Sequence, residues 1–293
     1  MANHLVARSF RKDASWRSSE ERIETCLIVR LAGKVIIVTG STTGIGKAIA
    51  QACVTEGACV VVHGLEDTLG AEVVAALGAD KAALHIEDIS HPGCATNLVN
   101  LALERFGRLD AIVNNAAAVV SSNIENTDLN FFRRVLEVNT LAPFSLIQTA
   151  LPHLSKVKGC VLNIGSVNAY SGEPNLFAYS VSKGALMTMT RNLGDTLHRE
   201  FGVRVNQINP GWVLTETEAQ RKKDHGLATD WYTRVPRVYA PAGRILWPRE
   251  IAVAAIYWLT DESGPISGQV VDLEQHPFIG RNPPKDQSTI PNV

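Results

Sequence analysis

Residues 34–46, KVIIVTGSTTGIG, run from a short apolar segment into a turn rich in glycine. The first part, 34–39, is β-branched and bounded by glycines, which predicts a buried strand. The following stretch, 47–57, predicts a helix that ends at Gly57. In this order, glycines let the backbone approach a pyrophosphate and the helix N-terminus stabilises its charge, as in dinucleotide-binding folds. A plain tight turn is the alternative for the glycines alone, but their position between strand and helix favours a nucleotide site.

Short apolar segments alternate with helical stretches along most of the chain. We expect seven strands, at 34–39, 58–62, 82–86, 110–114, 159–164, 203–208 and 269–273. This alternation without a linker predicts α/β architecture, a single-domain Rossmann-type fold with a doubly wound parallel sheet. We expect a polar N-terminal extension at 1–30, the domain at 31–276, and a proline-rich C-terminal tail at 277–293.

Composition narrows the class of protein. The 293 residues carry a formal net charge of −1 and no apolar run long enough to cross a membrane, so we expect neither nucleic-acid nor membrane partners. No hydrophobic segment follows the N-terminus, which argues against a secretory signal. Five scattered cysteines, at 26, 53, 59, 94 and 160, without a C-x-x-C pair, predict reduced core thiols in a cytoplasmic protein. The histidines lack zinc-ligand spacing, so we expect no metal site.

Tyr179 and Lys183 lie four residues apart in a predicted helix, 179–190, and therefore share one of its faces. An ammonium beside a phenol lowers the pKa of the phenol, so such a tyrosine can exchange a proton near neutral pH. Ser166 precedes it by 13 residues and can hold the reacting oxygen. An incidental pair on a helix face is the alternative for Tyr179 and Lys183 alone. The trio predicts proton transfer at a carbinol carbon, which usually needs a hydride partner.

The second predicted strand ends at Gly64, Leu65 and Glu66. In dinucleotide folds an acid at this point binds the ribose hydroxyls of NAD, whereas an arginine accommodates the phosphate of NADP. Gly64 and Leu65 occupy the positions where such an acid or arginine is expected, and Glu66 lies just beyond them. Neither lysine nor arginine is present at these positions. The cofactor is therefore NAD or NADP, with a lean to NAD.

Several further motifs occur in a familiar order. They are Thr39-Gly40-x-x-x-Gly44-x-Gly46, Asp88 in HIEDIS, Asn114-Asn115-Ala116-Ala117, Asn139 in LEVNT, the Ser166, Tyr179 and Lys183 trio, and Pro210-Gly211 with Thr215. Together they resemble the short-chain dehydrogenase/reductase family, from about residue 31 to about residue 274. Three departures stand out: Ala117 replaces the usual glycine, Gly165 precedes Ser166 where the family often has a second serine, and the segment after the last strand lacks the usual Asp-Gly-Gly.

The resemblance implies roles for particular residues. The catalytic set would be Asn139, Ser166, Tyr179 and Lys183. The cofactor would be bound by Gly40, Thr42, Thr43, Gly44, Ile45, Gly46, Gly64, Leu65, Asp88, Ile89, Asn115, Ala116, Tyr179, Lys183, Pro210, Gly211, Val213 and Thr215. Lys183 would also lower the pKa of Tyr179, and Asn139 would hold a relay water. Taken singly, Asp88 could instead be a strand-end cap, and Asn139 a hydrogen-bonded core residue.

The sequence indicates the residues around the substrate but does not identify the substrate. Segment 212–245, which the resemblance places over the active site, combines aromatic and basic residues: Trp212, Trp231, Tyr232, Tyr239, Arg221, Lys222, Lys223, Arg234 and Arg237. With Asn168, Tyr170 and Glu173 they suit a sugar, a polyol or a sugar acid, although the basic run is equally explained as a solvated helix face. The alternatives are NADPH-dependent reduction of a 3-oxoacyl ketone, an epimerase or lyase, and a non-catalytic nucleotide sensor or scaffold.

The resemblance also implies a homo-oligomer, a dimer or a tetramer. The helical regions at 131–151 and 179–199 are the expected interface, and both are rich in apolar residues. Helices buried against the sheet would have the same composition.

Overall fold

The computed structural model describes residues 29–277. The predicted N-terminal extension and C-terminal tail lie almost wholly outside the described residues, as does Cys26. Within them, Cys53, Cys59, Cys94 and Cys160 are free thiols, and all but Cys59 are buried.

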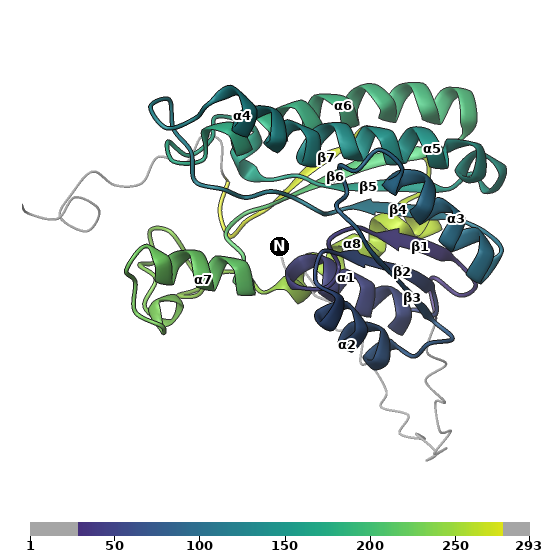
Figure 1. Ribbon diagram of the computed structural model, residues 1–293, viewed down its shortest axis with the longest axis horizontal. Helices are drawn as coiled ribbons and strands as arrows, with labels where there is room; N and C mark the ends of the chain where they lie inside the picture. The colour runs from purple at the N-terminus through teal and green to yellow at the C-terminus, as the bar shows by residue number, and fades with distance from the viewer. Residues whose placement is uncertain (1–28, 278–293) are drawn as a thin grey trace, which may run out of the picture.

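The centre of the molecule is a seven-stranded parallel sheet in the order β3-β2-β1-β4-β5-β6-β7 (Figure 1). The strands are β1 (Val35–Val38), β2 (Cys59–Gly64), β3 (Ala82–Ile86), β4 (Ala111–Asn114), β5 (Cys160–Ile164), β6 (Arg204–Pro210) and β7 (Val270–Leu273). All seven predicted strands are confirmed, with ends that differ by one or two residues. The strand order reverses between β1 and β4, and such a switch point is where open α/β sheets bind ligands.

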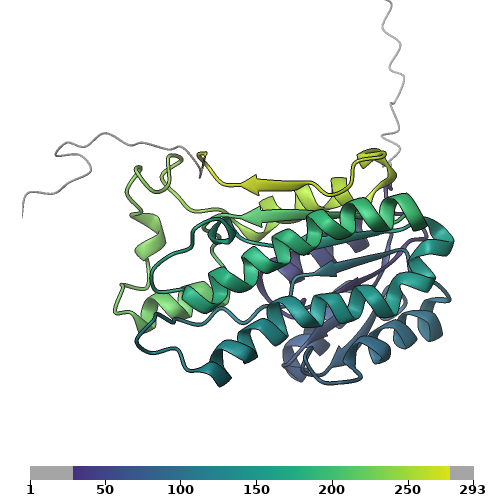
Figure 2. The same cartoon turned by 90° about the horizontal axis from the view of Figure 1, so that it is seen from above.

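Helices cover both faces of the sheet (Figures 1 and 2). They are α1 (Gly44–Thr55), α2 (Asp67–Leu77), α3 (Cys94–Phe106), α4 (Leu129–Leu136), α5 (Ala142–Val157), α6 (Phe177–Phe201), α7 (Glu216–Asp224) and α8 (Pro248–Leu259). Alternate residues of β1 pack on opposite sides, as strand geometry requires. Ile36 packs in the cluster that includes Ile49 of α1, and Ile37 in the cluster that includes Leu98 of α3 and Leu146 of α5.

The predicted helical region 131–151 is helical throughout, but it is not a regular α-helix. Between α4 and α5 the chain forms a π-helical turn, Glu137–Leu141. Pro143 follows at the start of α5 and has no amide hydrogen, so it cannot donate to the carbonyl of Asn139, its partner in a regular α-helix. Turns of this kind are frequent at functional sites.

Segment 212–245 projects from the carboxyl end of the sheet and carries α7 and a short 3₁₀ turn, Trp231–Thr233 (Figure 1). It has a small apolar cluster of its own, formed by Trp231, Val235, Ala240 and Ile245. The expectation of a loop with short helices at this position is confirmed. Among residues 29–277, no helix combines the length and apolar character that a membrane crossing requires.

Candidate active site

The predicted catalytic trio comes together where β5 ends. Ser166 follows β5, while Tyr179 and Lys183 lie on the first turns of α6. The hydroxyls of Tyr179 and Ser166 are hydrogen-bonded. Lys183 Nζ donates to the carbonyl of Ile164 at 2.7 Å and lies 5.7 Å from the centre of the Tyr179 ring. All three side chains are buried, so their chemistry takes place with little water.

Burial controls the protonation of this site. It raises the pKa of Tyr179, while the hydrogen bond with Ser166 and the positive charge of Arg221 oppose the rise. It lowers the pKa of Lys183 to about 7. The structure therefore differs from the prediction that Lys183 brings the pKa of Tyr179 down. Loss of water disfavours the charged form of both groups, and Lys183 is not among the groups that lower the pKa of Tyr179.

Asn139 lies in the π-helical turn and is fully buried. Its Oδ1 accepts the amide hydrogen of Ala118 at 2.7 Å, and its Nδ2 donates to the carbonyl of Ala118 at 3.1 Å and to Ser182 Oγ at 2.9 Å. Both amide hydrogens of the side chain are thus used within the protein. Asn139 ties the turn to α6 one residue before Lys183.

A chain of buried and half-buried polar side chains lies in the sheet next to Ser166. It links Asn114, Asn163, Thr190, Gln207, Asn209, Asp272 and Tyr170 through hydrogen bonds of 2.7 to 3.0 Å. Asn209 Oδ1 also accepts the amide hydrogen of Ser166 at 3.1 Å. Most of these supporting residues were missed from the sequence. The available indication was the presence of amide side chains within otherwise apolar strands.

The glycine turn is closely packed against the end of β4. A Cβ on Gly46 would lie 2.2 Å from the carbonyl oxygen of Gly40, and one on Gly40 would lie 2.8 Å from Cα of Ala116. Asn115 Nδ2 donates to the carbonyls of Thr39 and Gly40, each at 2.9 Å. Gly40 and Gly44 have positive φ, of 60° and 56°, which other residues rarely adopt. The turn needs its glycines for its conformation and its packing.

An acidic side chain already lies at the N-terminus of α1. The amide of Gly44 donates to Glu216 Oε2 of α7 at 3.0 Å. Thr43, the N-cap residue, makes no side-chain cap, and the first turn of α1 carries no acid of its own. The helix end thus offers its amides to an anion from elsewhere, as a pyrophosphate site would. In this respect Thr42, Thr43, Gly44, Ile45 and Gly46 fit a dinucleotide.

The residues predicted to bind the adenosine part of the cofactor lie at the ends of β2 and β3. Gly64 faces Thr42, since a Cβ there would lie 2.5 Å from the Thr42 methyl group, and Leu65 is two-thirds exposed. The Asp88 carboxylate accepts hydrogen bonds from Ser90 N at 3.0 Å and Ser90 Oγ at 2.8 Å. It also pairs with Arg134. Ile89, next along the loop, is partly buried.

His63 was not predicted to take part in the site. It is buried at the end of β2, and its Nδ1 accepts the amide hydrogen of Gly40 at 3.2 Å. Its Nε2 lies 3.0 Å from the carbonyl of Glu87, to which it donates if Nδ1 accepts. Burial lowers the pKa of His63 to about 4, so it is neutral at physiological pH and links the glycine turn to the loop after β3.

The predicted nicotinamide segment passes over the start of α1. Pro210 ends β6, Val213 forms an isolated bridge with Leu246, and Thr215 caps α7 by accepting the amide hydrogen of Glu218 at 3.1 Å. A Cβ on Gly44 would lie 3.2 Å from the Thr215 methyl group. The two predicted halves of the cofactor site, from the glycine turn and from segment 210–215, are thus adjacent.

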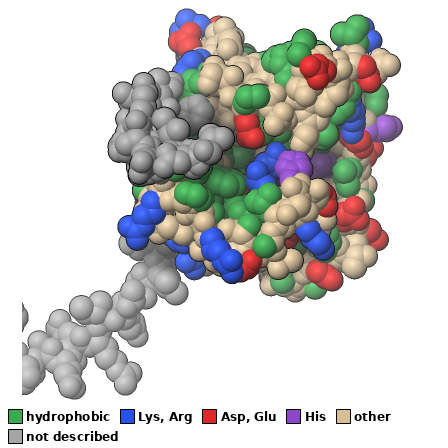
Figure 3. Space-filling model, turned by 90° about the vertical axis from the view of Figure 1, so that its left-hand side faces the viewer, with side chains coloured by type: hydrophobic (Ala, Val, Ile, Leu, Met, Phe, Trp, Pro, Cys, Tyr) green, Lys and Arg blue, Asp and Glu red, His purple; other side chains and the backbone are tan. Residues whose placement is uncertain are grey.

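The projecting segment brings its aromatic residues together. Trp212 and Trp231 stack with ring centres 5.1 Å apart, and Lys222 Nζ lies 5.2 Å from the centre of Trp212. Much of the basic run is neutralised locally, because Arg221 pairs with Glu218 at 2.8 Å and Arg234 with Asp230 at 2.9 Å. Figure 3 views this end of the molecule, where hydrophobic side chains gather beside lysine, arginine and histidine.

A hollow of about 410 Å³ lies beside the loop after β5. Asn168, Tyr170, Glu173 and Phe177 are among its lining residues. Its lining does not include Ser166, Tyr179 or Lys183, so the reacting atoms would not lie in it.

Comparison with known proteins gives consistent matches. A family model described as enoyl-(acyl carrier protein) reductase matches residues 40–274. The chain is 33% identical over 239 residues to an NADP-dependent (R)-specific alcohol dehydrogenase of Lentilactobacillus kefiri, covering 80% of this chain and 92% of that protein. It is 37% identical over 231 residues to an L-fucose dehydrogenase of Bos taurus, covering 78% and 83%.

Proposed function

Because the chain belongs to the short-chain dehydrogenase/reductase family, we propose that it interconverts a secondary alcohol group of a sugar, a polyol or a sugar acid and the corresponding ketone. At the coarser level it is an NAD(P)-dependent oxidoreductase that acts on CH–OH groups. The observation that carries the proposal is the buried contact of Tyr179 with Ser166, with Lys183 held one helical turn away.

The residues divide the chemistry between them. In oxidation, Tyr179 acts as the phenolate and takes the hydroxyl proton of the substrate; in reduction, the neutral phenol that burial favours gives this proton to the carbonyl oxygen. Ser166 orients the reacting oxygen and stabilises the charge that develops on it. The amino group of Lys183 lies one helical turn from Tyr179 and can exchange a proton in its neutral or its charged form. The backbone carbonyl of Asn139 receives no hydrogen bond from Pro143, which has no amide hydrogen, so it is a suitable acceptor for a relay water. The nicotinamide cofactor, when bound, exchanges the hydride.

We propose that NAD is preferred to NADP. Gly64, Leu65 and Glu66 at the end of β2 include no basic residue to neutralise a 2′-phosphate, and Glu66 is the acid nearest to the position that binds ribose hydroxyls in NAD-dependent folds. One relative is named as NADP-dependent, so titration of the protein with NADH and NADPH is decisive. Tighter binding of NADPH would contradict the preference.

Support for a hydroxylated substrate comes from the projecting segment. The stacked Trp212 and Trp231 offer flat apolar surfaces, and the positive charge of Arg221 reaches Tyr179 although Arg221 is paired with Glu218. A relative is named as an L-fucose dehydrogenase. Aromatic faces with a few polar groups are a combination that suits a compact polyhydroxylated ligand.

The test is a rate survey of the purified protein with NAD⁺ and NADP⁺. It should include L-fucose, other sugars, polyols, sugar acids and simple secondary alcohols, and, in the reverse direction, a 3-oxoacyl thioester with NADPH. The largest kcat/KM is expected with a sugar, a polyol or a sugar acid. Faster reduction of the thioester would favour the reductase alternative. Cofactor binding without turnover of any substrate would favour a sensor or scaffold.

A further inference from the structure

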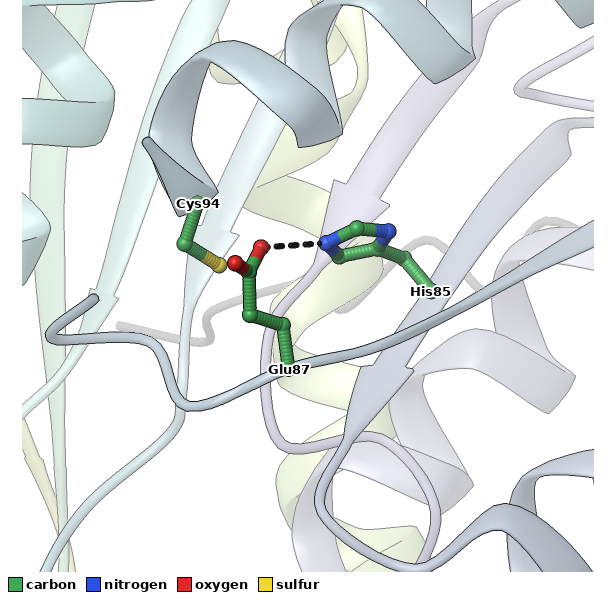
Figure 4. Close-up of side chains that lie close together, drawn as sticks. All are labelled: His85, Glu87 and Cys94. Carbon is green, nitrogen blue, oxygen red and sulfur yellow. Dashed lines mark hydrogen bonds and ion pairs between the residues drawn. The ribbon is translucent and has the colours of Figure 1, made fainter. Parts of the chain in front are cut away.

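A second group of reactive side chains lies near the end of β3, away from Ser166, Tyr179 and Lys183. His85 is in β3, Glu87 follows the strand, and Cys94 is the first residue of α3. Figure 4 shows the three side chains pointing toward one another. One donor atom from each lies within 4.8 Å of the others, and His85 Nε2 is 2.8 Å from Glu87 Oε2. The spacing of histidines alone predicted no metal site, because the ligands here are of three different types.

The donor set is one that zinc prefers. Imidazole nitrogen, thiolate sulfur and carboxylate oxygen bind zinc at about 2.0–2.3 Å, so tetrahedral ligands lie roughly 3.4–3.7 Å apart. The three donor atoms lie within 4.8 Å of one another, and the pair His85 Nε2 and Glu87 Oε2, at 2.8 Å, is closer than this spread. Small side-chain rotations would bring them around one ion. A carboxylate and a thiolate would together balance its two positive charges.

A fourth ligand is available on the solvent side. His91 Nδ1 lies 2.7 Å from Glu87 Oε1, and its side chain is largely exposed and free to turn. On the buried side, His63 Nε2 lies 3.8 Å from Cys94 Sγ, but both of its ring nitrogens are engaged with Gly40 and Glu87. His91 is therefore the better candidate. The resulting pattern in the sequence is His-x-Glu-x-x-x-His-x-x-Cys.

We propose that His85, Glu87 and Cys94 bind a zinc-type divalent cation, with His91 as the fourth ligand. Such an ion would join the end of β3 to the start of α3. It would also fix the connecting loop, which carries Asp88 and Ile89. The inference is independent of the substrate and the direction of catalysis.

The test uses the untagged full chain, stripped of metal with a chelator. Zinc affinity and stoichiometry are measured by competition with a chromogenic chelator, and cobalt(II) is used as a spectroscopic probe. We expect one equivalent per chain, a sulfur-to-cobalt charge-transfer band, and a zinc-dependent rise in the thermal midpoint. Cys94→Ala should remove the charge-transfer band. It should also weaken zinc binding by at least the roughly 10–100-fold that loss of a supporting group around a metal costs.

Two matched controls and a second variant make the result decisive. Cys59→Ala and His153→Ala remove a cysteine and a histidine outside the group and should leave zinc binding unchanged. His85→Gln, at a partly exposed position, should weaken binding even if Cys94→Ala folds poorly. Failure of the wild type to bind one equivalent would overturn the proposal and leave a hydrogen-bonded cluster only. Binding that survives both His85→Gln and Cys94→Ala would overturn it equally.

Discussion

Tyr179 is the residue on which the proposed chemistry depends most directly. Its hydroxyl meets that of Ser166 in a buried site, so replacing it with phenylalanine removes one oxygen and little packing. We expect Tyr179→Phe to lower kcat by about 10²–10⁴-fold, the range for loss of a general acid–base group. Cofactor affinity and the thermal midpoint should change little. Tyr257→Phe, on α8, is the matched control, and near-normal kcat for Tyr179→Phe would contradict the assignment.

The buried amino group of Lys183 leads to a prediction about how the stability of the protein depends on pH. Its folded pKa is about 7, below its value near 10.4 in an unfolded chain. Between these values the unfolded state binds more protons, so the contribution of Lys183 to stability rises as pH increases from about 7 to about 10. At lower pH the folded protein must keep a charged lysine buried.

Lys183→Met removes this titration. We expect the variant to have a higher thermal midpoint than the wild type at about pH 6, with the difference shrinking as pH rises to about 9. Thermal unfolding followed by circular dichroism across this range measures it. Lys156→Met, at an exposed position on α5, should leave the pH dependence unchanged. A constant difference between Lys183→Met and wild type would show that Lys183 keeps an ordinary pKa.

At the scale of elements, α7 and α1 are coupled by one contact. Glu216 of α7 accepts from Gly44 at the N-terminus of α1, where the phosphates of a dinucleotide are expected. A phosphate bound at the Gly44 amide would take the place of the carboxylate, and the Glu216 side chain would turn away from α1.

Glu216→Gln should therefore strengthen cofactor binding. A charge at a helix end is worth about 0.3–1 kcal/mol, which corresponds to roughly a 2- to 5-fold lower Kd for NADH. Fluorescence titration measures it, and Asp224→Asn, the same charge change at the other end of α7, is the control. Unchanged or weaker binding in Glu216→Gln alone would show that the carboxylate does not compete with the phosphates.

Elements also show where sequence reasoning succeeds. The strands and α6 follow from apolar periodicity, because their burial is local and repetitive. The π-helical turn at Asn139 was missed because the sequence of this region predicts one continuous apolar helix. The change from α-helix to π-helix depends on Pro143 and on tertiary hydrogen bonds. The Glu216 contact was likewise invisible, because it joins residues 172 positions apart.

Over the whole molecule, the grouping of Ser166, Tyr179 and Lys183 was predictable because their spacing reflects one helix and one strand end. The supporting polar chain was not, since Asn209 and Asp272 meet only through the pairing of β6 with β7. The direction of the pKa shift of Tyr179 was also predicted wrongly. It depends on how completely the fold removes water from the site, which spacing along a chain does not express.

The layer of α4, α5 and α6 leaves apolar side chains on its outer face, which Figure 2 views. Leu141, Phe144, Phe177 and Val181 are each between about a third and a half exposed. Exposed apolar side chains on neighbouring helices are typical of interfaces. We therefore expect the protein to form a dimer or a tetramer through this layer.

The variant Phe144→Asp with Val181→Asp should shift the protein toward a monomer of 31.7 kDa, because each interface would bury unpaired carboxylates. Light scattering after size exclusion measures the mass. Val253→Asp, on the exposed side of α8, introduces the same change elsewhere and should leave the assembly intact. A wild-type monomer at micromolar concentration would refute the expected oligomer. A double variant that keeps the wild-type mass would show that the subunits meet through another face.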